Sequence, residues 1–325
     1  MTAHGRPVLL VLRALGLGDL LTGVPALRAL AQAFPDHRRV LAAPRALAPL
    51  ARSSGAIDAV HDSHGLDPLR TGAAPDVAVN LHGRGPQSHR LLLAAAARRV
   101  IAFAHPDVPE VAGPRWRQGE HEVARWCRLL EESGIAADRT RVDLPAPQRS
   151  VPARARGATL IHPGAKSPAR RWPADRWAEV AAARVAAGHD VVVTGGGDEL
   201  ELARAVARGA GLDPTAVHAG GTDVVGLAAL VAAAGHVVCG DTGVAHLATA
   251  LGTPSVVLFG PSSPQEWGPP PERPQHRVLW AGATGDPHAD SVDAGLLAIT
   301  VDEVLAALEQ DPARPFAAAT RGGTR

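Results

Sequence analysis

The sequence predicts an α/β protein with two doubly wound parallel sheets, one in each half of the chain. Short apolar or β-branched runs alternate with longer helical stretches rich in Ala and Leu, a rhythm typical of parallel sheets covered by helices. A chain of 325 residues is long enough for two ordinary cores. Residues 143–157 carry three prolines and no apolar periodicity, as exposed connections do. We therefore predict a first domain over residues 1–150, a second over residues 151–310 and a flexible tail over residues 311–325.

Each half supplies enough elements for its own sheet. In the first half, strands are expected at residues 8–12, 39–43, 59–61, 77–81 and 99–103, and helices at residues 19–34 and 45–53. In the second half, strands are expected at residues 159–162, 190–194, 237–239 and 255–259, and helices at residues 174–187, 199–210, 224–234, 242–251 and 301–309. Ligands of open α/β sheets bind beyond the carboxyl ends of the strands, so we expect the chemistry in the loops that follow them.

Composition excludes several classes of protein. Lys and Arg number 33 against 32 Asp and Glu, so the chain lacks the basic footprint of a nucleic-acid binder. Its two cysteines, Cys127 and Cys239, have no CxxC spacing and are expected to be buried thiols in a reducing compartment. Arg13 interrupts the first apolar run, so neither a signal peptide nor a membrane span is predicted and a cytoplasmic location is expected.

The loop after the first expected strand contains Gly16, Gly18 and Asp19. The glycines allow a tight turn and a close approach of backbone to a ligand, and a carboxylate at the helix start would face that ligand. The spacing lacks the last glycine of the G-x-G-x-x-G fingerprint. Asp is also a favoured N-cap residue, so the spacing alone fits a cap and a functional carboxylate equally well.

The loop after residues 159–162 reads HPGAKSPARRWP and gathers three cations, Lys166, Arg170 and Arg171. Basic side chains beside the turn at Gly164 suit a diphosphate, and Pro173 suits a helix start. The alternative is a solvated basic loop with no ligand.

The next loop in the second half follows residues 190–194 and reads GGGDE. Gly195 and its neighbours would let a ribose lie against backbone, and an acidic side chain such as Glu199 could accept hydrogen bonds from ribose hydroxyls. Ordinary strand-to-helix turn chemistry, with acidic residues favoured by the helix dipole, explains the same pattern.

The segment GDTGVAH after residues 237–239 is the most specific feature of the chain. Asp241, Thr242 and Gly243 form a turn whose amides open a helix, which is a ready site for a phosphate group. His246 lies one helical turn beyond Thr242, so both side chains can face one ligand. A capped helix with a buried polar His is the structural alternative.

The segment NLHGRGPQSHR, residues 80–90, follows a strand of the first half. It places His82, Gln87 and His89 where sugar hydroxyls or a phosphorylated acceptor would bind. A polar loop with a helix cap accounts for these residues equally well.

The motifs HPGA, RWP, GGGDE and GDTGVAHLATALGTPSVVLFGP resemble, in order, the C-terminal half of glycosyltransferase family 9, the ADP-heptose:lipopolysaccharide heptosyltransferase family. GLGDLLTGVPAL and DVAVNLHGRGPQSHRLL look like its N-terminal motifs, so the resemblance runs from about residue 8 to residue 308. It implies a GT-B fold, in which two Rossmann-like domains face each other across a cleft. It further implies an inverting transfer without a metal, with the acceptor held mainly by the first domain and the nucleotide sugar by the second.

The resemblance also assigns roles to residues. Asp19 would be the general base, and Arg170, where the family often has Lys, would stabilise the leaving diphosphate. The donor would be bound by Gly18, His162, Gly164, Lys166, Thr194, Gly195, Glu199, Asp241, Thr242, Gly243 and His246. The acceptor would be bound by His82, Gln87 and His89, although Asn80 stands where the family commonly has an acidic residue.

The expected substrates are an ADP-type nucleotide sugar and a saccharide or lipid-linked acceptor, with a peripheral contact to the inner membrane surface. No cofactor is expected. No metal is expected either, because the sequence has no DxD run and its scattered histidines lack a supporting carboxylate pattern. One alternative is an NAD-dependent nucleotide-sugar epimerase or dehydrogenase, which usually needs a catalytic Tyr, whereas this chain has none. The other alternative is a nucleotide-sugar binding protein without catalysis.

Overall fold

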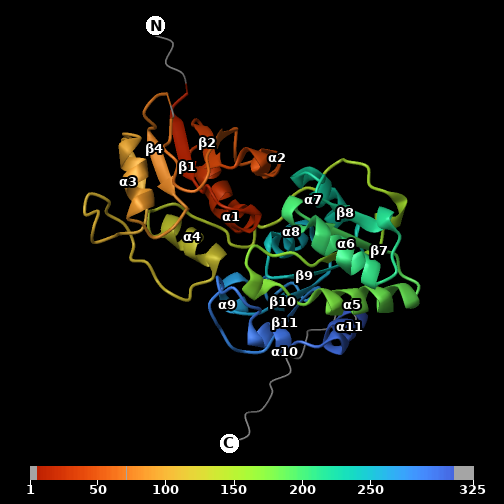
Figure 1. Ribbon diagram of the computed structural model, residues 1–325. Helices are drawn as coiled ribbons and strands as arrows, with labels where there is room; N and C mark the ends of the chain where they lie inside the picture. The colour runs from red at the N-terminus through yellow and green to blue at the C-terminus, as the bar shows by residue number, and fades with distance from the viewer. Residues whose placement is uncertain (1–5, 71, 311–325) are drawn as a thin grey trace, which may run out of the picture.

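The computed structural model describes residues 6–70 and 72–310, and its first half forms a five-stranded parallel sheet. The strand order is β3-β2-β1-β4-β5 (Figure 1). The strands are β1 Val8–Leu12, β2 Arg38–Ala43, β3 Ala59–Asp62, β4 Val77–Asn80 and β5 Arg99–Ile101. The helices are α1 Leu17–Ala33, α2 Ala48–Ser53, α3 Gln87–Ala94 and α4 Glu122–Glu131.

The second half forms a six-stranded parallel sheet in the order β11-β10-β9-β6-β7-β8. The strands are β6 Thr159–His162, β7 Val191–Gly195, β8 Val217–Ala219, β9 His236–Gly240, β10 Ser255–Phe259 and β11 His276–Trp280. The helices are α5 Ala174–Ala186, α6 Leu200–Gly209, α7 Val224–Ala233, α8 Gly243–Leu251, α9 Pro264–Trp267, α10 Ala294–Ala298 and α11 Val301–Glu309.

The strand order of each sheet reverses at one point, and both reversals fall beside the first strand of their half. In the first sheet β1 pairs with β2 on one side and β4 on the other, and in the second sheet β6 pairs with β7 and β9. Such a switch point is where doubly wound sheets bind ligands, beyond the carboxyl ends of the strands. The loops that follow β1, β4, β6 and β9 are therefore the ones placed for function.

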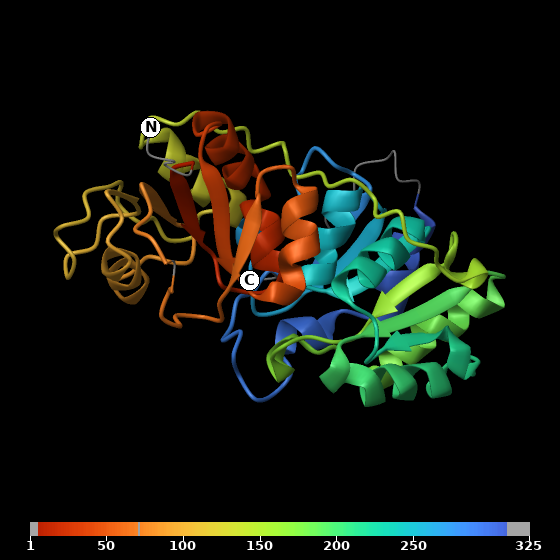
Figure 2. The ribbon, with the colours of Figure 1, turned by 90° about the horizontal axis from the view of Figure 1, so that it is seen from above.

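The central strands are mostly apolar because helices cover both faces of each sheet. β1 (VLLVL) and β10 (SVVLF) are buried along almost their whole length. One continuous core joins the two halves, because Leu20 and Val24 of α1 pack in the same apolar cluster as Val244 and Leu247 of α8. Both ribbon views place the N-terminal half directly beside α7 and α8 (Figures 1 and 2).

The predicted strands of both halves are confirmed to within a few residues, and so is the pair of doubly wound sheets. The prediction missed the strands β8 and β11 and the helices α3, α4, α9 and α10. In β11 the reason is that His276 and Arg277 are buried and paired, with His276 Nδ1 lying 2.9 Å from Ser255 Oγ. Buried polar residues of this kind make a core strand look like a surface loop in the sequence.

The predicted domain boundary near residue 150 lies in a segment without regular structure between Glu131 and β6, interrupted by one short 3-10 turn at Ala153–Ala155. The predicted flexible tail, residues 311–325, lies outside the described residues. Over the described part of the chain, no helix combines the length and apolarity needed to cross a bilayer.

Candidate active site

Four loops were predicted to be functional: the first follows β1, and the second, third and fourth follow β6, β7 and β9. Contacts between them join all four into one set. Gly18 of the first loop touches His246 of the fourth. Arg170 of the second loop contacts Asp241 of the fourth, and Gly164 of the second contacts Glu199 of the third. The chain therefore gathers the motif residues of both halves around the first turns of α1 and α8. We call residues 16–20 and 241–246 the α1–α8 junction.

Asp19 lies in the first turn of α1, and its side chain is 27% exposed. The helix begins two residues earlier than predicted, so Gly16 and not Asp19 occupies the N-cap position. The Gly16 amide nevertheless donates to Asp19 Oδ2 at 3.2 Å. One oxygen thus closes the helix end in the manner of a capping box, while the carboxylate keeps an exposed face. The capping and functional interpretations of Asp19 are compatible.

Sequence reasoning missed Arg13, which lies directly beneath Asp19. Its guanidinium is fully buried and donates to the backbone carbonyls of Asp19 and Leu81. Its Nη2 is 3.0 Å from both Thr22 Oγ1 and Glu122 Oε1. A buried charge needs such partners, because an unpaired one costs several kcal/mol of desolvation. The sequence did contain a signal for Arg13. It is a charged residue that directly follows an apolar strand, in the loop that carries the predicted carboxylate Asp19.

Two glycines allow the first turns of α1 and α8 to meet. A Cβ on Gly18 would lie 2.9 Å from His246 Cδ2. A Cβ on Gly243 would lie 2.9 Å from Leu17 Cβ and 3.0 Å from the Gly18 amide nitrogen. Both distances are shorter than a carbon side chain tolerates without displacement of its neighbours. Gly18 and Gly243 therefore bring Asp19 next to the predicted phosphate site.

The start of α8 has the features of an anion site. Thr242 is the N-cap and accepts from the Val244 amide at 3.4 Å, which leaves the helix N-terminus directed at the junction. Asp241 is buried, and burial raises its pKa despite the opposing effects of His246 and Arg170. Burial likewise lowers the pKa of His246, so the imidazole is held neutral near pH 7.

Arg170 is the cation that the structure places at this anion site. Its Nη1 lies 4.0 Å from Asp241 Oδ2 and 3.4 Å from the Asp241 carbonyl oxygen. Arg171 is used inside its own loop, where Nε donates to the Ala165 carbonyl at 2.7 Å. Lys166 is exposed. Arg170 is therefore the best placed of the three predicted cations to contact a group bound at α8.

The second and third loops are held together by His162 and Glu199. His162 Nδ1 is 3.0 Å from Thr194 Oγ1, and its Nε2 is 3.7 Å from Glu199 Oε2. Burial lowers the pKa of His162. Glu199 also accepts from the Gly196 amide at 2.7 Å, and its carboxylate occupies the space where a Cβ of Gly164 would be. Gly195 lies against the Glu199 side chain in the same turn.

Thr194 requires a correction. It was expected to contact the donor, but it is fully buried and its hydroxyl faces His162 and the Ile161 carbonyl. Successive residues of a strand point to opposite faces of the sheet. The Thr194 side chain points into the core. Its role is to fix the ring of His162.

The three predicted acceptor residues fall in different environments. His82 is half-buried, and burial followed by the charge of Arg13 lowers its pKa, while Asp19 opposes this. Gln87 is exposed at the start of α3. The expectation for His89 is wrong, because it is fully buried with Nε2 2.6 Å from the Phe103 carbonyl oxygen and Nδ1 3.3 Å from Asn80 Nδ2.

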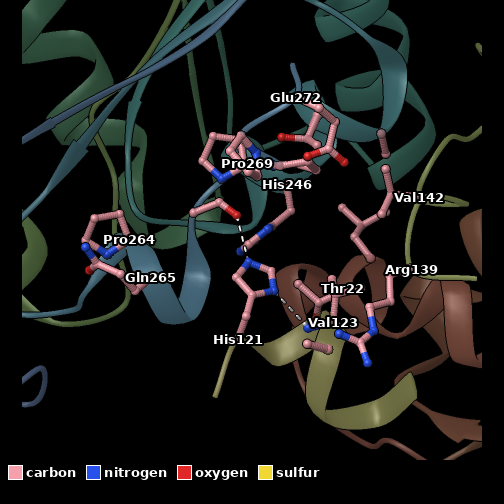
Figure 3. Close-up of a pocket in the computed structure, with 17 residues that line it drawn as sticks. Thr22, His121, Val123, Arg139, Val142, His246, Pro264, Gln265, Pro269 and Glu272 are labelled. Carbon is pink, nitrogen blue, oxygen red and sulfur yellow. Dashed lines mark hydrogen bonds between the residues drawn. The ribbon is translucent and has the colours of Figure 1, made fainter. Parts of the chain in front are cut away.

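A pocket of about 480 Å³ lies next to the junction and is walled by both halves of the chain. Figure 3 shows His121 and Thr22 from the first half opposite His246 and the prolines of the second. His121 Nε2 donates to the Gly268 carbonyl at 3.0 Å across this boundary. Its lining is mainly apolar and includes His246 of the predicted donor site, but not Asp19, Arg170 or Glu199.

Within residues 6–70 and 72–310, no cluster of three or more His, Cys, Asp or Glu side chains is arranged to hold a metal ion. Groups at the junction that can offset negative charge include the α8 amides and the Arg170 guanidinium.

Comparison with protein families matches residues 113–292, more than half of the chain, to the model of glycosyltransferase family 9 (heptosyltransferase). Lipopolysaccharide heptosyltransferase 2 of Escherichia coli K12 is 32% identical over 169 residues. That match covers 46% of this chain and 48% of the relative, so the chain spans about half the length of this curated relative in the match.

Two solved structures share the fold over nearly the whole chain. A family 9 glycosyl transferase from Veillonella parvula has a TM-score of 0.77 at 20% identity and covers 93% of this chain and 96% of its own. The E. coli ADP-heptose lipopolysaccharide heptosyltransferase II has a TM-score of 0.70 at 23% identity, and the match covers 93% of this chain and 97% of that one. These similarities confirm the GT-B architecture expected from the sequence.

The burial of Asp241 predicts an unusual pH dependence. A carboxyl whose folded pKa is raised favours the folded state below its unfolded pKa and loses that contribution as the pH rises through the folded pKa. Asp241→Asn removes the cost of the buried charge. We expect its free energy of unfolding in urea to exceed that of the unsubstituted protein at about pH 8 and the difference to shrink toward about pH 5.

The exposed Asp67→Asn is the matched control and should show no such trend. A loss of stability in Asp241→Asn that grows with pH would mean that the ionised carboxylate stabilises the fold.

Proposed function

This chain belongs to glycosyltransferase family 9, and on that premise we propose that it is an inverting, metal-independent enzyme that transfers heptose or a related sugar from an ADP-type donor to a hydroxyl of a saccharide or glycolipid. The observation that carries the proposal is the α1–α8 junction. There a partly exposed carboxylate, Asp19, lies beside a helix N-terminus that has Arg170 next to it. A base and a phosphate site on opposite domains are what a sugar transfer from a nucleotide diphosphate requires.

The donor half supplies contacts for each part of a nucleotide sugar. The diphosphate binds at the α8 amides beside Thr242 and Gly243, where helix N-termini favour anions. Arg170 offers two donors in a fork that matches phosphate oxygens. Glu199, which is partly exposed above the Gly195 turn, accepts hydrogen bonds from the ribose. ADP is the expected nucleotide because the related E. coli enzyme named above is an ADP-heptose transferase.

The reaction follows from this arrangement. Asp19 takes the proton of the acceptor hydroxyl as its oxygen attacks the anomeric carbon of the sugar. The bond from that carbon to the diphosphate oxygen breaks on the opposite face, so configuration is inverted. The leaving ADP takes the bonding electron pair, and its developing charge is stabilised by Arg170 and the α8 amides.

The acceptor approaches from the first half, which carries His82. Burial and the charge of Arg13 lower the pKa of His82, and the charge of Asp19 opposes this. Because burial holds the imidazole neutral, His82 can bind a sugar hydroxyl without competing for the proton. Gln87 is exposed on the same segment. A lipopolysaccharide acceptor, as the name of the E. coli relative indicates for that protein, would bring the chain to the inner membrane surface.

The proposal is tested by nucleotide selectivity. In a thermal-shift panel of ADP, UDP, GDP, CDP and NAD with EDTA present, we expect ADP to give the largest rise in Tm. A ligand at about 100 times its Kd adds roughly 2.7 kcal/mol of stability. ADP-heptose should then release ADP when a heptose-deficient lipopolysaccharide is added. Stabilisation by NAD alone would favour an oxidoreductase, and ADP-heptose binding without turnover would favour a non-catalytic binding protein.

Asp19→Asn should lower kcat by about 10²–10⁴-fold, because the base is lost while the side-chain shape is kept. The Kd for ADP-heptose, measured by calorimetry, should change little since the donor is held by the other half. Asp175→Asn, an exposed carboxylate in the first turn of α5, is the matched control. An Asp19→Asn enzyme with most of its turnover would remove Asp19 from the role of base.

Arg170→Ala should weaken ADP binding and lower kcat by roughly 10²–10³-fold, the range seen when a donor to a developing negative charge is removed. Arg204→Ala, on the exposed side of α6, serves as the control for loss of one positive charge. If steady-state kinetics of Arg170→Ala were unchanged, the diphosphate contact would pass to Lys166 or Arg171.

A further inference from the structure

We propose that Arg13, held in place by Glu122, is the positioning residue for Asp19. The inference rests on the proposed function, because it concerns how the base of that reaction is placed. Arg13 contacts no substrate group directly and acts through Asp19.

Arg13 joins three elements at the base of the first loop. Its Nε donates to the Asp19 carbonyl in α1, and its Nη1 donates to the Leu81 carbonyl just after β4. Its Nη2 contacts Thr22 one helical turn further along α1. The first turn of α1 is thereby tied to the carboxyl ends of β1 and β4, which flank the switch point of the first sheet.

The same guanidinium also flanks the reacting group. Arg13 Nη2 lies 3.7 Å from Asp19 Oδ1, on the oxygen that does not accept from the Gly16 amide. The carboxylate is therefore fixed from two sides, by the Gly16 amide and by the charge of Arg13. Such fixing matters for a general base, because a misplacement of about 1 Å can cost roughly 10²-fold in rate.

Glu122 is what allows a full charge to lie at this buried position. It is itself buried at the start of α4 and accepts from Arg13 Nη2, Arg125 Nη1 and Trp126 Nε1, the last at 2.8 Å. Burial alone would raise the pKa of Glu122, but Arg13 and Arg125 outweigh it and the pKa is lowered. Arg13 also packs over the ring of Trp126, 5.1 Å from its centroid. The guanidinium thus has little freedom to move.

Arg125 provides a control within the same cluster. It bonds to Glu122 as Arg13 does, and it lies 4.5 Å from the Trp116 ring centroid, but it has no described contact with α1. Arg13→Lys and Arg125→Lys both keep the positive charge. Both also shorten the side chain, so that its hydrogen-bond donors no longer reach as far. Only the first of them withdraws the contacts to Asp19.

The first measurement is the split between kcat and KM, with ADP-heptose and heptose-deficient lipopolysaccharide as substrates. We expect Arg13→Lys to lower kcat by about 10²-fold with the donor KM changed less than about threefold. Arg125→Lys should stay within about threefold of the unsubstituted enzyme in both. Equal losses of kcat in the two variants would overturn the proposal, because the cluster would then be only structural.

The second measurement is a double-mutant cycle with Asp19→Asn. A residue that acts through Asp19 should cause no further loss in the background that lacks the base. Independent losses that multiply in the double variant would assign Arg13 a role unconnected with Asp19 and overturn the proposal.

The third measurement does not depend on activity. Amide hydrogen exchange of residues 14–20 should be faster in Arg13→Lys and unchanged in Arg125→Lys, because only Arg13 pins the first turn of α1. If the unsubstituted protein releases no ADP from ADP-heptose, the proposed function fails while this comparison still decides the positioning role. Equal exchange in the two variants would overturn that role.

Discussion

The close approach of two helix N-termini is the constraint on which this structure depends. The first turn of α1 carries the carboxylate Asp19, and the first turn of α8 opens the predicted phosphate site. They can meet because Gly18 and Gly243 have no Cβ, and either added carbon would lie within 3.0 Å of the other half. The apolar core that runs from α1 into α8 holds this contact. The predicted site residues of both halves are brought together by packing and not by a flexible connection.

The two halves share one topology but place different chemistry at their switch points. In each sheet the strand order reverses beside the first strand, between β1 and β4 and between β6 and β9. The first half places a carboxylate there, with Arg13 buried behind it. The second half places a helix N-terminus, Arg170 and a buried carboxyl group, Asp241, whose pKa burial raises. Two sheets of similar topology thus carry different side-chain chemistry at corresponding positions.

Burial of the polar groups at the junction costs stability. It disfavours the charged forms of both Asp241 and His246, raising the pKa of the first and lowering that of the second, while each side chain opposes the shift in the other. Arg13 is better compensated, because Glu122, Thr22 and two backbone carbonyls accept hydrogen bonds from its guanidinium. Sites that bind ligands often keep such penalties, whereas the groups that support them are more completely paired.

Local sequence patterns were enough to predict the two sheets, most of their strands, and the loops that carry Asp19, Arg170 and Asp241, because the periodicity of apolar residues and glycine-rich turns are local properties. They did not predict which of those residues meet, because those contacts depend on the packing of the folded chain. Arg13 pairs with Glu122, which is 109 residues away, and His89 turns into the core although its segment reads as a polar loop. Burial and ion pairing depend on how distant elements pack against each other, and that information is not present in any single stretch of the chain.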